Sequence, residues 1–387
     1  MLPILYPSGT SKSDFFANNG LGFFNRCTKC NVTEERNGMY ELVMNILPSD
    51  RLAKTSVCGM FVKAKPNPFD TPQIFEIYSQ SVSRDKIEIQ AQHIHYFLNT
   101  IVSAEPIDKR TGTPIQIWNA LHNFWVPNVS IDLFSFATDI TTSGTVSAGY
   151  ISSGNGRNIS ISELLSGTDG SMLDVFHGEY YYDNFNVSLL QNRGTDTGIA
   201  LRYGSNISSK KQSSSNQTMY SHIMPYAKVQ MFEEDTGQTS DLYVYISGGI
   251  TIANSALNYP KALLYDFSDR MSDVTLRRYS PGYYYNLQEV QDRLEQEALD
   301  YTSKYNSALT QLSTNIQIDL PETLNSLQGC KLCDTVLVDM DDNGTKSRAK
   351  ITKTVYDVLG ERYTKIELGQ PRKTIADMIT VKNLGGA

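Results

Sequence analysis

Two Cys-x-x-Cys pairs are the feature of this sequence with the most obvious chemistry. Cys27 and Cys30 stand in CTKC, and Cys330 and Cys333 stand in CKLC, far along the chain. A structural zinc ion needs four ligands that converge tetrahedrally, and such pairs normally sit in tight knuckles rich in Gly or Pro. Both pairs here lead directly into strand-like sequence, where residues three apart point to opposite faces. We therefore expect small buried side chains at two strand starts rather than zinc ligands.

A histidine pair is the second candidate for metal binding. His93 and His95 are expected on one face of a strand, as in metal-binding His-x-His pairs. A third ligand at a recognisable spacing is missing, because His122, His177 and His222 are scattered along the chain. The sequence therefore favours a hydrogen-bonded structural pair over a metal site.

An acidic segment, DMDDNGTKSRAK, has the look of a calcium-binding loop. Asp339, Asp341, Asn343 and Gly344 occupy suitable positions, but the twelfth position, which should be a bidentate glutamate, is Lys350. A hairpin turn between two strands is the better interpretation. Nucleophile elbows, His-Glu-x-x-His, Walker loops and dinucleotide fingerprints do not occur in the sequence. We predict no catalytic residue, no cofactor and no metal.

Composition limits the class of protein. The chain has 387 residues, which suggests several domains, and its formal charge of -7 argues against a nucleic-acid grip. Such a charge instead suits a surface that nucleic acid passes without binding. No signal peptide and no apolar run long enough to span a bilayer are evident. Five cysteines, one necessarily unpaired, fit synthesis in a reducing cytoplasm.

Period-2 alternation predicts that most of the chain forms strands, so the fold class is mainly β with some α. The segment MYELVMNIL follows an Asn-Gly turn and is the strongest hairpin signal. The other expected strands are FEIYSQSV, KIEIQAQHIHYFL, NFNVSLLQ, GIALRYG, DTVLVDM and AKITKTVYDVL. Residues 138–170 and 204–217 are rich in Ser, Gly and Asn, and we expect loops there.

One long amphipathic helix is predicted over residues 286–313. Asn286 is its expected cap, with Glu289 completing a capping-box-like start. Its apolar stripe, at alternating spacings of three and four, consists of Leu287, Val290, Leu294, Ala298, Tyr301, Tyr305, Ala308 and Leu312. The opposite face is charged, so the helix should lie across a sheet; a coiled-coil partner is the alternative.

Several stretches in order resemble one family, the tail-tip (baseplate) hub proteins of long-tailed bacteriophages, also called tail-associated lysins or prophage endopeptidase tail proteins. The resemblance begins with NNGLGFF, NVTEERNGMYELVM, PQIFEIYSQ and KIEIQAQHIHYFL, and ends with MPYAK, CDTVLV and YDVLGERYTKIELG. HGEYYYDNFNVSLLQNRGTDTGIALRYGSNI is its most specific block. Cys333 stands where the family usually has glycine, which marks the second Cys-x-x-Cys as a strand entry.

The resemblance implies two small β-barrels in a pseudo-sixfold ring, with peripheral α/β subdomains. The expected division is 1–104 for the first barrel, 105–176 for a peripheral subdomain, 177–235 with 321–369 for a discontinuous second barrel, 236–320 for an inserted subdomain with the long helix, and 370–387 for a C-terminal tail. Whether the two barrels bring the cysteine pairs together is an open question at this point.

The same resemblance implies a structural, non-enzymatic role in the virion, at the distal tip of the tail, after synthesis in the host bacterial cytoplasm. The protein would form a homotrimer that plugs or gates the tail channel. The implied partners are the distal tail protein or tail tube protein, the tape-measure protein and the receptor-binding protein. Phage DNA would pass through without specific binding, and the chain would not insert into a membrane.

Two other functions compete with the structural hub. Many members of the family carry a peptidoglycan-cutting domain after this module, so a tail-associated cell-wall endopeptidase is the main alternative. The chain has no papain-like Cys-His pattern and no zinc-peptidase signature. A host-surface adhesin that binds saccharide is the third hypothesis.

Overall fold

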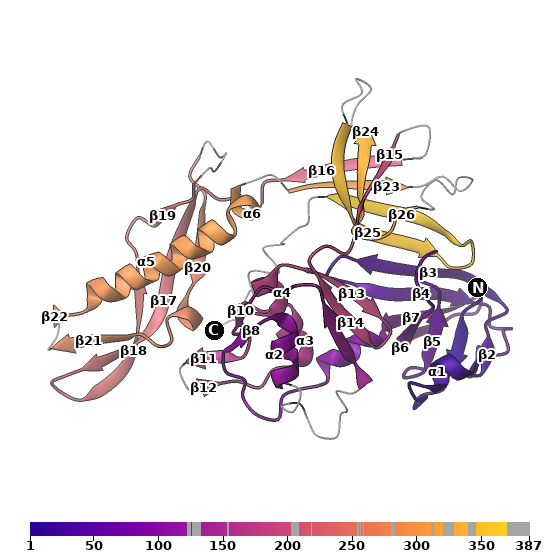
Figure 1. Ribbon diagram of the computed structural model, residues 1–387, viewed down its shortest axis with the longest axis horizontal. Helices are drawn as coiled ribbons and strands as arrows, with labels where there is room; N and C mark the ends of the chain where they lie inside the picture. The colour runs from indigo at the N-terminus through magenta and orange to yellow at the C-terminus, as the bar shows by residue number, and fades with distance from the viewer. Residues whose placement is uncertain are drawn as a thin grey trace.

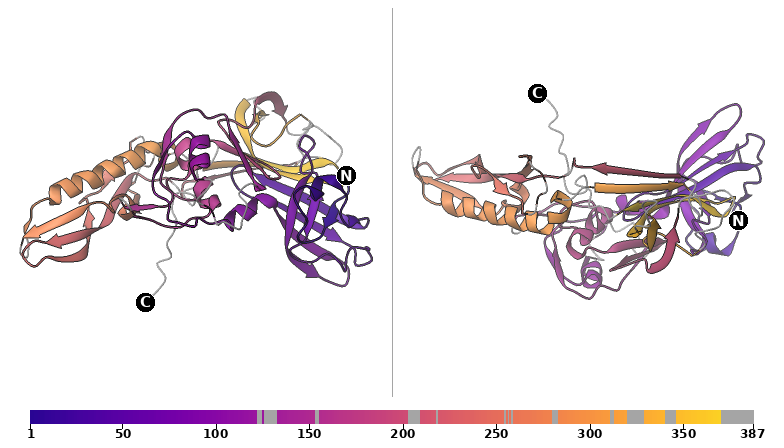
Figure 2. Two further views of the ribbon diagram at one scale, coloured as in Figure 1. Left: turned by 60° about the horizontal axis from the view of Figure 1, so that its bottom comes forward. Right: turned by 90° about the horizontal axis from the view of Figure 1, so that it is seen from above.

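The computed structural model shows an elongated molecule, with a helix-bearing arm at one end and the N-terminal strands at the other (Figure 1). It describes residues 1–121, 125, 133–152, 155–202, 209–217, 219–253, 255, 257, 259–279, 283–310, 313–319, 329–339 and 346–369. Figure 2 shows the same arm projecting from the rest of the chain in two further views. We call the part of the chain outside this arm the body.

The N-terminal part of the body is built from short and medium strands. Its elements are β1 (Ile4–Tyr6), α1 (Asp14–Ala17), β2 (Gly22–Phe23), β3 (Cys27–Glu35), β4 (Tyr40–Ile46), β5 (Phe61–Ala64), β6 (Gln73–Val82), β7 (Ile87–His93) and the 3-10 helix η1 (Ile94–Asn99). In β4, Tyr40, Leu42, Met44 and Ile46 alternate with partly exposed residues and are buried. The strand expected from MYELVMNIL is therefore confirmed, and its apolar side chains drive the burial.

A more irregular part follows, with short helices over small sheets. It comprises β8 (Arg110–Gly112), α2 (Pro114–Leu121), β9 (Ser135–Thr138), β10 (Gly144–Val146), β11 (Tyr150–Ser152), β12 (Asn155–Gly156), α3 (Ile161–Leu165), α4 (Met172–Phe176), β13 (Glu179–Asp183) and β14 (Asn186–Leu190). The prediction of a loop over 138–170 is therefore wrong in part, because short strands and a helix form within this range. Ser160 caps α3 in a complete capping box with Glu163, a local signal that the Ser-rich composition obscured.

The remaining strands of the body come from the second half of the chain. They are β15 (Asp196–Leu201), β16 (Ser209–Ser215), β23 (Ser313–Asp319), β24 (Thr335–Asp339), β25 (Lys346–Asp357) and β26 (Arg362–Gly369). The loop expected over 204–217 is wrong for 209–215, because β16 pairs in register with β23 from Ser209↔Asp319 to Ser215↔Ser313. Backbone pairing there outweighs a polar composition.

One 13-stranded sheet joins the two halves of the chain, in the order β16-β23-β26-β25-β3-β4-β7-β6-β5-β1-β2, with β24 pairing to β25 and β15 pairing to β24. The link is the antiparallel pairing of β25 with β3, in which Val355 lies opposite Thr33. One hydrophobic cluster spans this link, from Leu5 to Leu368. The N-terminal and C-terminal strands are therefore held by one ladder and one core.

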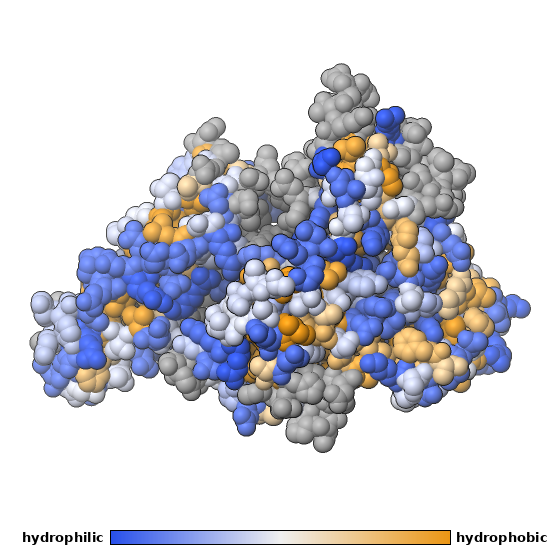
Figure 3. All heavy atoms as spheres, viewed as in Figure 1, coloured by the Kyte–Doolittle hydropathy of each residue, from blue (hydrophilic) through white to orange (hydrophobic). Residues whose placement is uncertain are grey.

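The arm has its own sheet and core. Its elements are β17 (His222–Glu233), β18 (Gln238–Tyr245), β19 (Ile250–Thr251), β20 (Ala262–Asp266), η4 (Ser268–Arg270), β21 (Thr275–Tyr279), β22 (Tyr283–Tyr284), α5 (Leu287–Lys304) and α6 (Asn306–Thr310). Helix α5 packs across this sheet, with Val290, Leu294, Ala298 and Tyr301 buried. Its outward face is mainly hydrophilic (Figure 3). The prediction of an amphipathic helix lying on a sheet is confirmed.

The bounds and the cap of that helix differ from the prediction. The helical stretch breaks at Tyr305, and the chain is already in β23 at Ser313; Leu312 lies outside the described residues. Asn286 makes no side-chain cap. Its amide instead accepts from the Arg277 N–H at 2.7 Å and donates to the Thr275 carbonyl at 2.8 Å. The Asn286 side chain therefore hydrogen-bonds to the backbone of β21 instead of capping α5.

The mainly β fold is confirmed, whereas closure into two barrels and the division into domains stay predictions. Strand β17, which the expected division places in the second barrel, pairs with β18, β19, β20 and β21 of the arm. Strand β23, placed in the inserted subdomain, pairs with β16 and β26 of the body. The tail 370–387 lies outside the described residues. In the described part of the chain, no helix is both long enough and apolar enough to cross a bilayer.

Candidate functional site: a buried polar junction

The first Cys-x-x-Cys pair lies at a β-bulge. Cys27 pairs with Ile46 and Lys29 with Asn45, so two steps along β3 match one step along β4. Thr28 is the extra residue. Because the bulge shifts the alternation by one, Cys27 and Cys30 share a face, and Cys30 lies opposite Met44. The expectation that the two thiols point to opposite faces is wrong for this pair.

The second pair lies in a tight turn before β24. The Asp334 N–H donates to the Lys331 carbonyl at 3.1 Å, and the Lys331 N–H donates to the Asp334 carboxylate at 2.9 Å. Cys333 has a φ of 73°, the left-handed conformation that glycine adopts most easily. This explains why glycine fits at this strand entry. Cys330 and Cys333 are both buried in the body core.

Among the described residues, neither cysteine pair lies in a group of three or more His, Cys, Asp or Glu side chains that could hold a metal ion. For the calcium-like segment, β24 and β25 pair as a hairpin, with Asp339 opposite Lys346. The intervening positions, including Asp341, Asn343 and Gly344, lie outside the described residues.

The two histidines of the expected pair contact each other. Strand β7 ends at His93, and His95 lies in η1, yet their Nδ1 atoms are 2.9 Å apart. The other ring nitrogen of His93, Nε2, lies 3.1 Å from Gln73 Oε1 and donates to it. Burial lowers the pKa of His93, and it lowers that of His95 to about 3. Both imidazoles are therefore neutral near pH 7.

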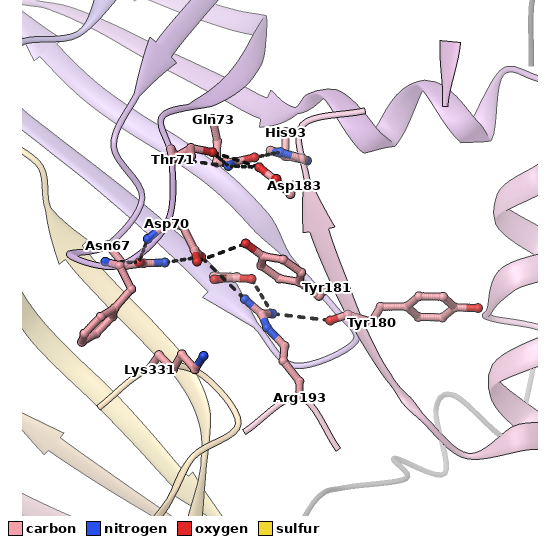
Figure 4. A network of polar contacts seen from close by, with 12 residues as sticks. Asn67, Asp70, Thr71, Gln73, His93, Tyr180, Tyr181, Asp183, Arg193 and Lys331 are labelled. Carbon is pink, nitrogen blue, oxygen red and sulfur yellow. Dashed lines mark hydrogen bonds and ion pairs between the residues drawn. The ribbon is translucent and has the colours of Figure 1, made fainter. Parts of the chain in front are cut away.

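The most elaborate polar arrangement in the body is centred on Arg193, in the turn between β14 and β15 (Figure 4). Its guanidinium donates to Glu34 Oε1 at 2.7 Å and lies 4.0 Å from Asp70 Oδ2. It stacks over the Tyr181 ring at 4.6 Å from the centroid, and the Tyr181 hydroxyl donates to Asp70 at 3.1 Å. Only 7% of the Arg193 side chain and 6% of the Glu34 side chain are exposed.

A second carboxylate, Glu179 on β13, completes the arrangement. It accepts from Arg36 Nε at 2.7 Å, from Lys350 Nζ at 2.5 Å and from the Arg193 backbone N–H at 2.7 Å. These donors come from the end of β3, from β25 and from the turn before β15. We call the set Glu34, Arg36, Asp70, Glu179, Arg193 and Lys350 the body junction. It ties three parts of the chain together.

Gly194 lets the backbone beside Arg193 approach the second cysteine turn. A Cβ at residue 194 would overlap the Cys333 carbonyl and the Asp334 N–H. The next residue, Thr195, donates its N–H to Asp334 Oδ1 at 2.8 Å, and its carbonyl accepts from Thr335 at 2.9 Å. The Cys-x-x-Cys turn and Arg193 are thereby fixed relative to each other.

The charged groups of the body junction form ion pairs with one another, and these pairs influence the pKa values of its carboxyl groups. Burial raises the pKa of Glu34, and the charge of Arg193 opposes that rise. Burial acts in the same direction on Glu179, but hydrogen bonds from Lys350 and Arg193 and the charge of Arg36 bring its pKa below the ordinary value. A buried charge is stable only when it is paired and hydrogen-bonded. This arrangement can hold segments of the chain together, because its charged groups pair with one another.

Sequence reasoning missed the body junction. Arg193 and Glu179 lie in the block HGEYYYDNFNVSLLQNRG, but their partners Glu34 and Lys350 come from distant segments. The only local signal is charge at strand ends, which is ordinary in solvated turns. Pairing of β3 with β25 was needed to bring these charges together.

A second polar contact joins the body to the arm. Asp174 on α4 accepts from the Tyr305 hydroxyl at 2.5 Å and from Lys304 Nζ at 3.0 Å. Arg270 of the arm donates to Asp169 through Nε and Nη2, at 3.1 and 2.9 Å. We call these five residues the arm contact. Half of the Asp169 side chain is exposed, at 51%, so water reaches this contact.

Comparison with known proteins places this fold among phage tail proteins. Residues 195–379 match the family model described as "Prophage endopeptidase tail". No curated protein matches the chain significantly. Prophage tail protein gp18 from Listeria monocytogenes EGD-e is similar with a TM-score of 0.54 and 14% identity, covering 98% of this chain and 97% of its own. The 43 kDa tail protein of prophage MuSo2 from Shewanella oneidensis is similar with a TM-score of 0.52 and 11% identity, covering 95% and 98%.

The resemblance to phage tail proteins inferred from the sequence is confirmed by both kinds of comparison. The family match covers much of the second half of the chain, whereas the structural likeness extends over nearly all of it. The chain has the mainly β fold of prophage tail proteins and, from residue 195 to residue 379, the sequence pattern of the prophage endopeptidase tail family.

Proposed function

We propose that this chain is a structural hub at the distal end of a phage tail. It forms a homotrimeric ring that plugs or gates the tail channel, and it connects the tail tube or distal tail protein to the host-recognition apparatus during DNA delivery. The observation that carries this proposal is the fold shared along the whole length with prophage tail proteins, together with the family match over 195–379.

The construction of the body supports a rigid structural role. A ring subunit must keep its shape while neighbouring parts are pushed or pulled during infection. The β3–β25 ladder and the body junction fix the N-terminal and C-terminal strands to each other, and both ion-paired carboxylates, Glu34 and Glu179, are buried. The net charge of -7 suits a channel wall along which DNA moves without binding.

The proposal assigns no chemical reaction to this chain. The charged side chains of the body junction pair with one another, so they position strands rather than a substrate. The remaining proposed partners are the tape-measure protein and the receptor-binding protein. The proposed location is the virion.

Imaging of the full-length chain tests the hub directly. We expect light scattering to give the mass of a trimer, alone or on addition of the distal tail protein, and electron microscopy to show a threefold ring with a central hole. A chain that stays monomeric in both conditions, or assembles without threefold symmetry, would refute the hub.

A tail-associated cell-wall endopeptidase is the second candidate, favoured by the word "endopeptidase" in the description of the matching family. A zymogram on host cell wall separates the two functions. Under the hub proposal the isolated chain clears no cell wall, whereas clearing that persists after gel filtration of the chain would favour the enzyme.

A further inference from the structure

We propose that Cys27 and Cys30 form a redox-active pair that closes to an intramolecular disulfide, with Cys27 as the thiol that reacts first. This part of β3 has no role in the proposed hub function. The bulge at Thr28 places the two thiols on one face, whereas residues three apart in a regular strand point to opposite faces.

The bulge gives the geometry. With Thr28 as the extra residue, Cys27 lies opposite Ile46 and Cys30 lies opposite Met44. Ile46 and Met44 are two apart on β4, and both are buried in the body core. The two cysteines therefore lie side by side on the core face, where the Cys27 thiol donates to the Lys29 carbonyl at 3.1 Å. A regular strand would have kept them apart.

Exposure divides the roles of the two thiols. Cys27 is partly exposed and is followed by the exposed residues Thr28 and Lys29, so it is the more accessible of the two cysteines. Cys30 is fully buried beneath it. The neighbouring Cys30 side chain lowers the pKa of Cys27, while burial raises the pKa of Cys30. The accessible thiol is therefore also the one that more easily becomes a thiolate, the reactive form.

The second pair is an internal control with the same spacing. Cys330 and Cys333 are both fully buried, in a tight turn. Cys330 Sγ lies 3.8 Å from the Thr197 hydroxyl. Burial raises the pKa of Cys330, and it raises that of Cys333 to about 12. The two pairs have equal spacing, but only the first contains a partly exposed thiol, Cys27, so we expect the first pair to react faster.

The proposed chemistry is thiol–disulfide exchange with a low-molecular-weight disulfide such as oxidised glutathione. The Cys27 thiolate attacks one sulfur of that disulfide, whose S–S bond breaks and releases one glutathione thiolate, which takes up a proton. Cys30 then loses its proton and attacks Cys27 Sγ, displacing the second glutathione. The protein loses two protons and two electrons, and one oxidised glutathione takes them up to become two reduced ones.

Peptide mapping of the folded full-length chain tests this. Reduced protein is exposed to oxidised glutathione, quenched in acid, unfolded, alkylated with N-ethylmaleimide and digested with trypsin. Because Lys29 lies between the two cysteines, cleavage at Arg26, Lys29 and Arg36 leaves peptides 27–29 and 30–36, which only a disulfide can hold together. Lys331 lies between Cys330 and Cys333 and makes the second pair readable in the same way. The mapping uses the parent chain, in which the exposed Cys58 is the control for oxidant access, and it is repeated with Cys58→Ser to exclude links to Cys58.

We expect the linked 27–29/30–36 species to form at least about tenfold faster than any link between Cys330 and Cys333, in line with the difference in thiolate access. In Cys30→Ser the glutathione adduct should remain trapped on Cys27, and in Cys27→Ser residue 30 should stay free. The variants Cys27→Ala and Cys30→Ala replace the serine variants if those fail to fold by circular dichroism.

Two results would overturn the proposal. One is full alkylation of both Cys27 and Cys30 after oxidant treatment that modifies Cys58 in the parent chain. The other is a stable glutathione adduct on Cys27 of the parent chain without the internal link, since it would mean that Cys30 cannot reach Cys27. Both readings come from the parent protein and do not depend on whether the variants fold.

Discussion

The body junction and the arm contact both join parts of the chain through charged side chains, but water reaches them to very different extents. Arg193 and Glu34 of the body junction are nearly inaccessible, and one hydrophobic cluster continues across the β3–β25 link beside them. In the arm contact, Asp169 is half exposed, and the arm and the body have separate hydrophobic clusters. Separating two buried charges has a large free-energy cost, because each charge is left without a partner and without water. Partly hydrated charges can exchange their partner for water.

That difference assigns different mechanical roles to the two contacts. The body junction should give way only when the body unfolds. The arm contact should be able to open while both cores stay folded, because opening it exposes polar side chains such as Asp174 and Lys304 and leaves the core of the arm intact.

Removing Arg193 should have the largest effect. Arg193→Ala leaves Glu34 buried without its counter-charge, so we expect a loss of about 3–5 kcal/mol of unfolding free energy. Urea unfolding followed by tryptophan fluorescence measures it. Arg348→Ala is the matched control, since Arg348 also makes a 2.7 Å ion pair, with Asp196, but both side chains are exposed. A loss below about 1 kcal/mol for Arg193→Ala would contradict the proposed rigidity of the body junction.

Mild acid should destabilise the body before it affects the arm contact. The folded-state pKa of His93 lies below its ordinary value, so its contribution is present above pH 6.5 and is lost as the pH falls toward the folded pKa. Between pH 6.5 and pH 5 we expect a loss of about 2 kcal/mol for this histidine. Urea midpoints measured across that range test it. In His93→Gln the pH dependence should fall to about half, because His95, whose pKa burial lowers to about 3, still contributes. An equally steep dependence in that variant would exclude His93 as a source.

Neutralising Asp174 should loosen the arm without unfolding the body. Burial would raise the pKa of this carboxyl, but the donors Tyr305, Gly170 and Lys304 lower it, so the charge persists in the native state and its contribution is lost only below about pH 4. Asp174→Asn should cost about 1–2 kcal/mol at neutral pH. We expect faster hydrogen exchange in α4 and α6 with unchanged exchange in β3 and β25. Equal acceleration in β3 would show that the arm and body are not separable.

Arg270→Gln should have the smallest effect. Its partner Asp169 is half exposed, so the ion pair should contribute about 0.5 kcal/mol. A double-mutant cycle with Asp174→Asn measures whether the two halves of the arm contact act together. Strict additivity would mean that they open independently, whereas coupling above about 0.5 kcal/mol would make the arm contact a single cooperative unit.

Local patterns predicted the elements well and their ends poorly. The alternation in MYELVMNIL predicts β4 correctly, and the stripe from Val290 to Tyr301 predicts the helix on the arm sheet. The cap at Asn286 and the loop over 209–215 were wrong, because a side chain and a strand found partners from elsewhere in the fold. Composition and local pattern reflect the preferences of an isolated segment, whereas in the folded protein these segments form hydrogen bonds with other strands.

For the candidate site, the amino-acid sequence by itself determined the inventory: two cysteine pairs, a histidine pair, and the block containing Glu179 and Arg193. The pairing of strands in the tertiary structure determined which contacts each of these groups makes. A single bulged residue, Thr28, puts Cys27 and Cys30 on one face, and the β3–β25 ladder brings Glu34 and Lys350 to the Glu179–Arg193 turn. The physical reason is that face and partner depend on register, and register is set by strands that are distant in sequence.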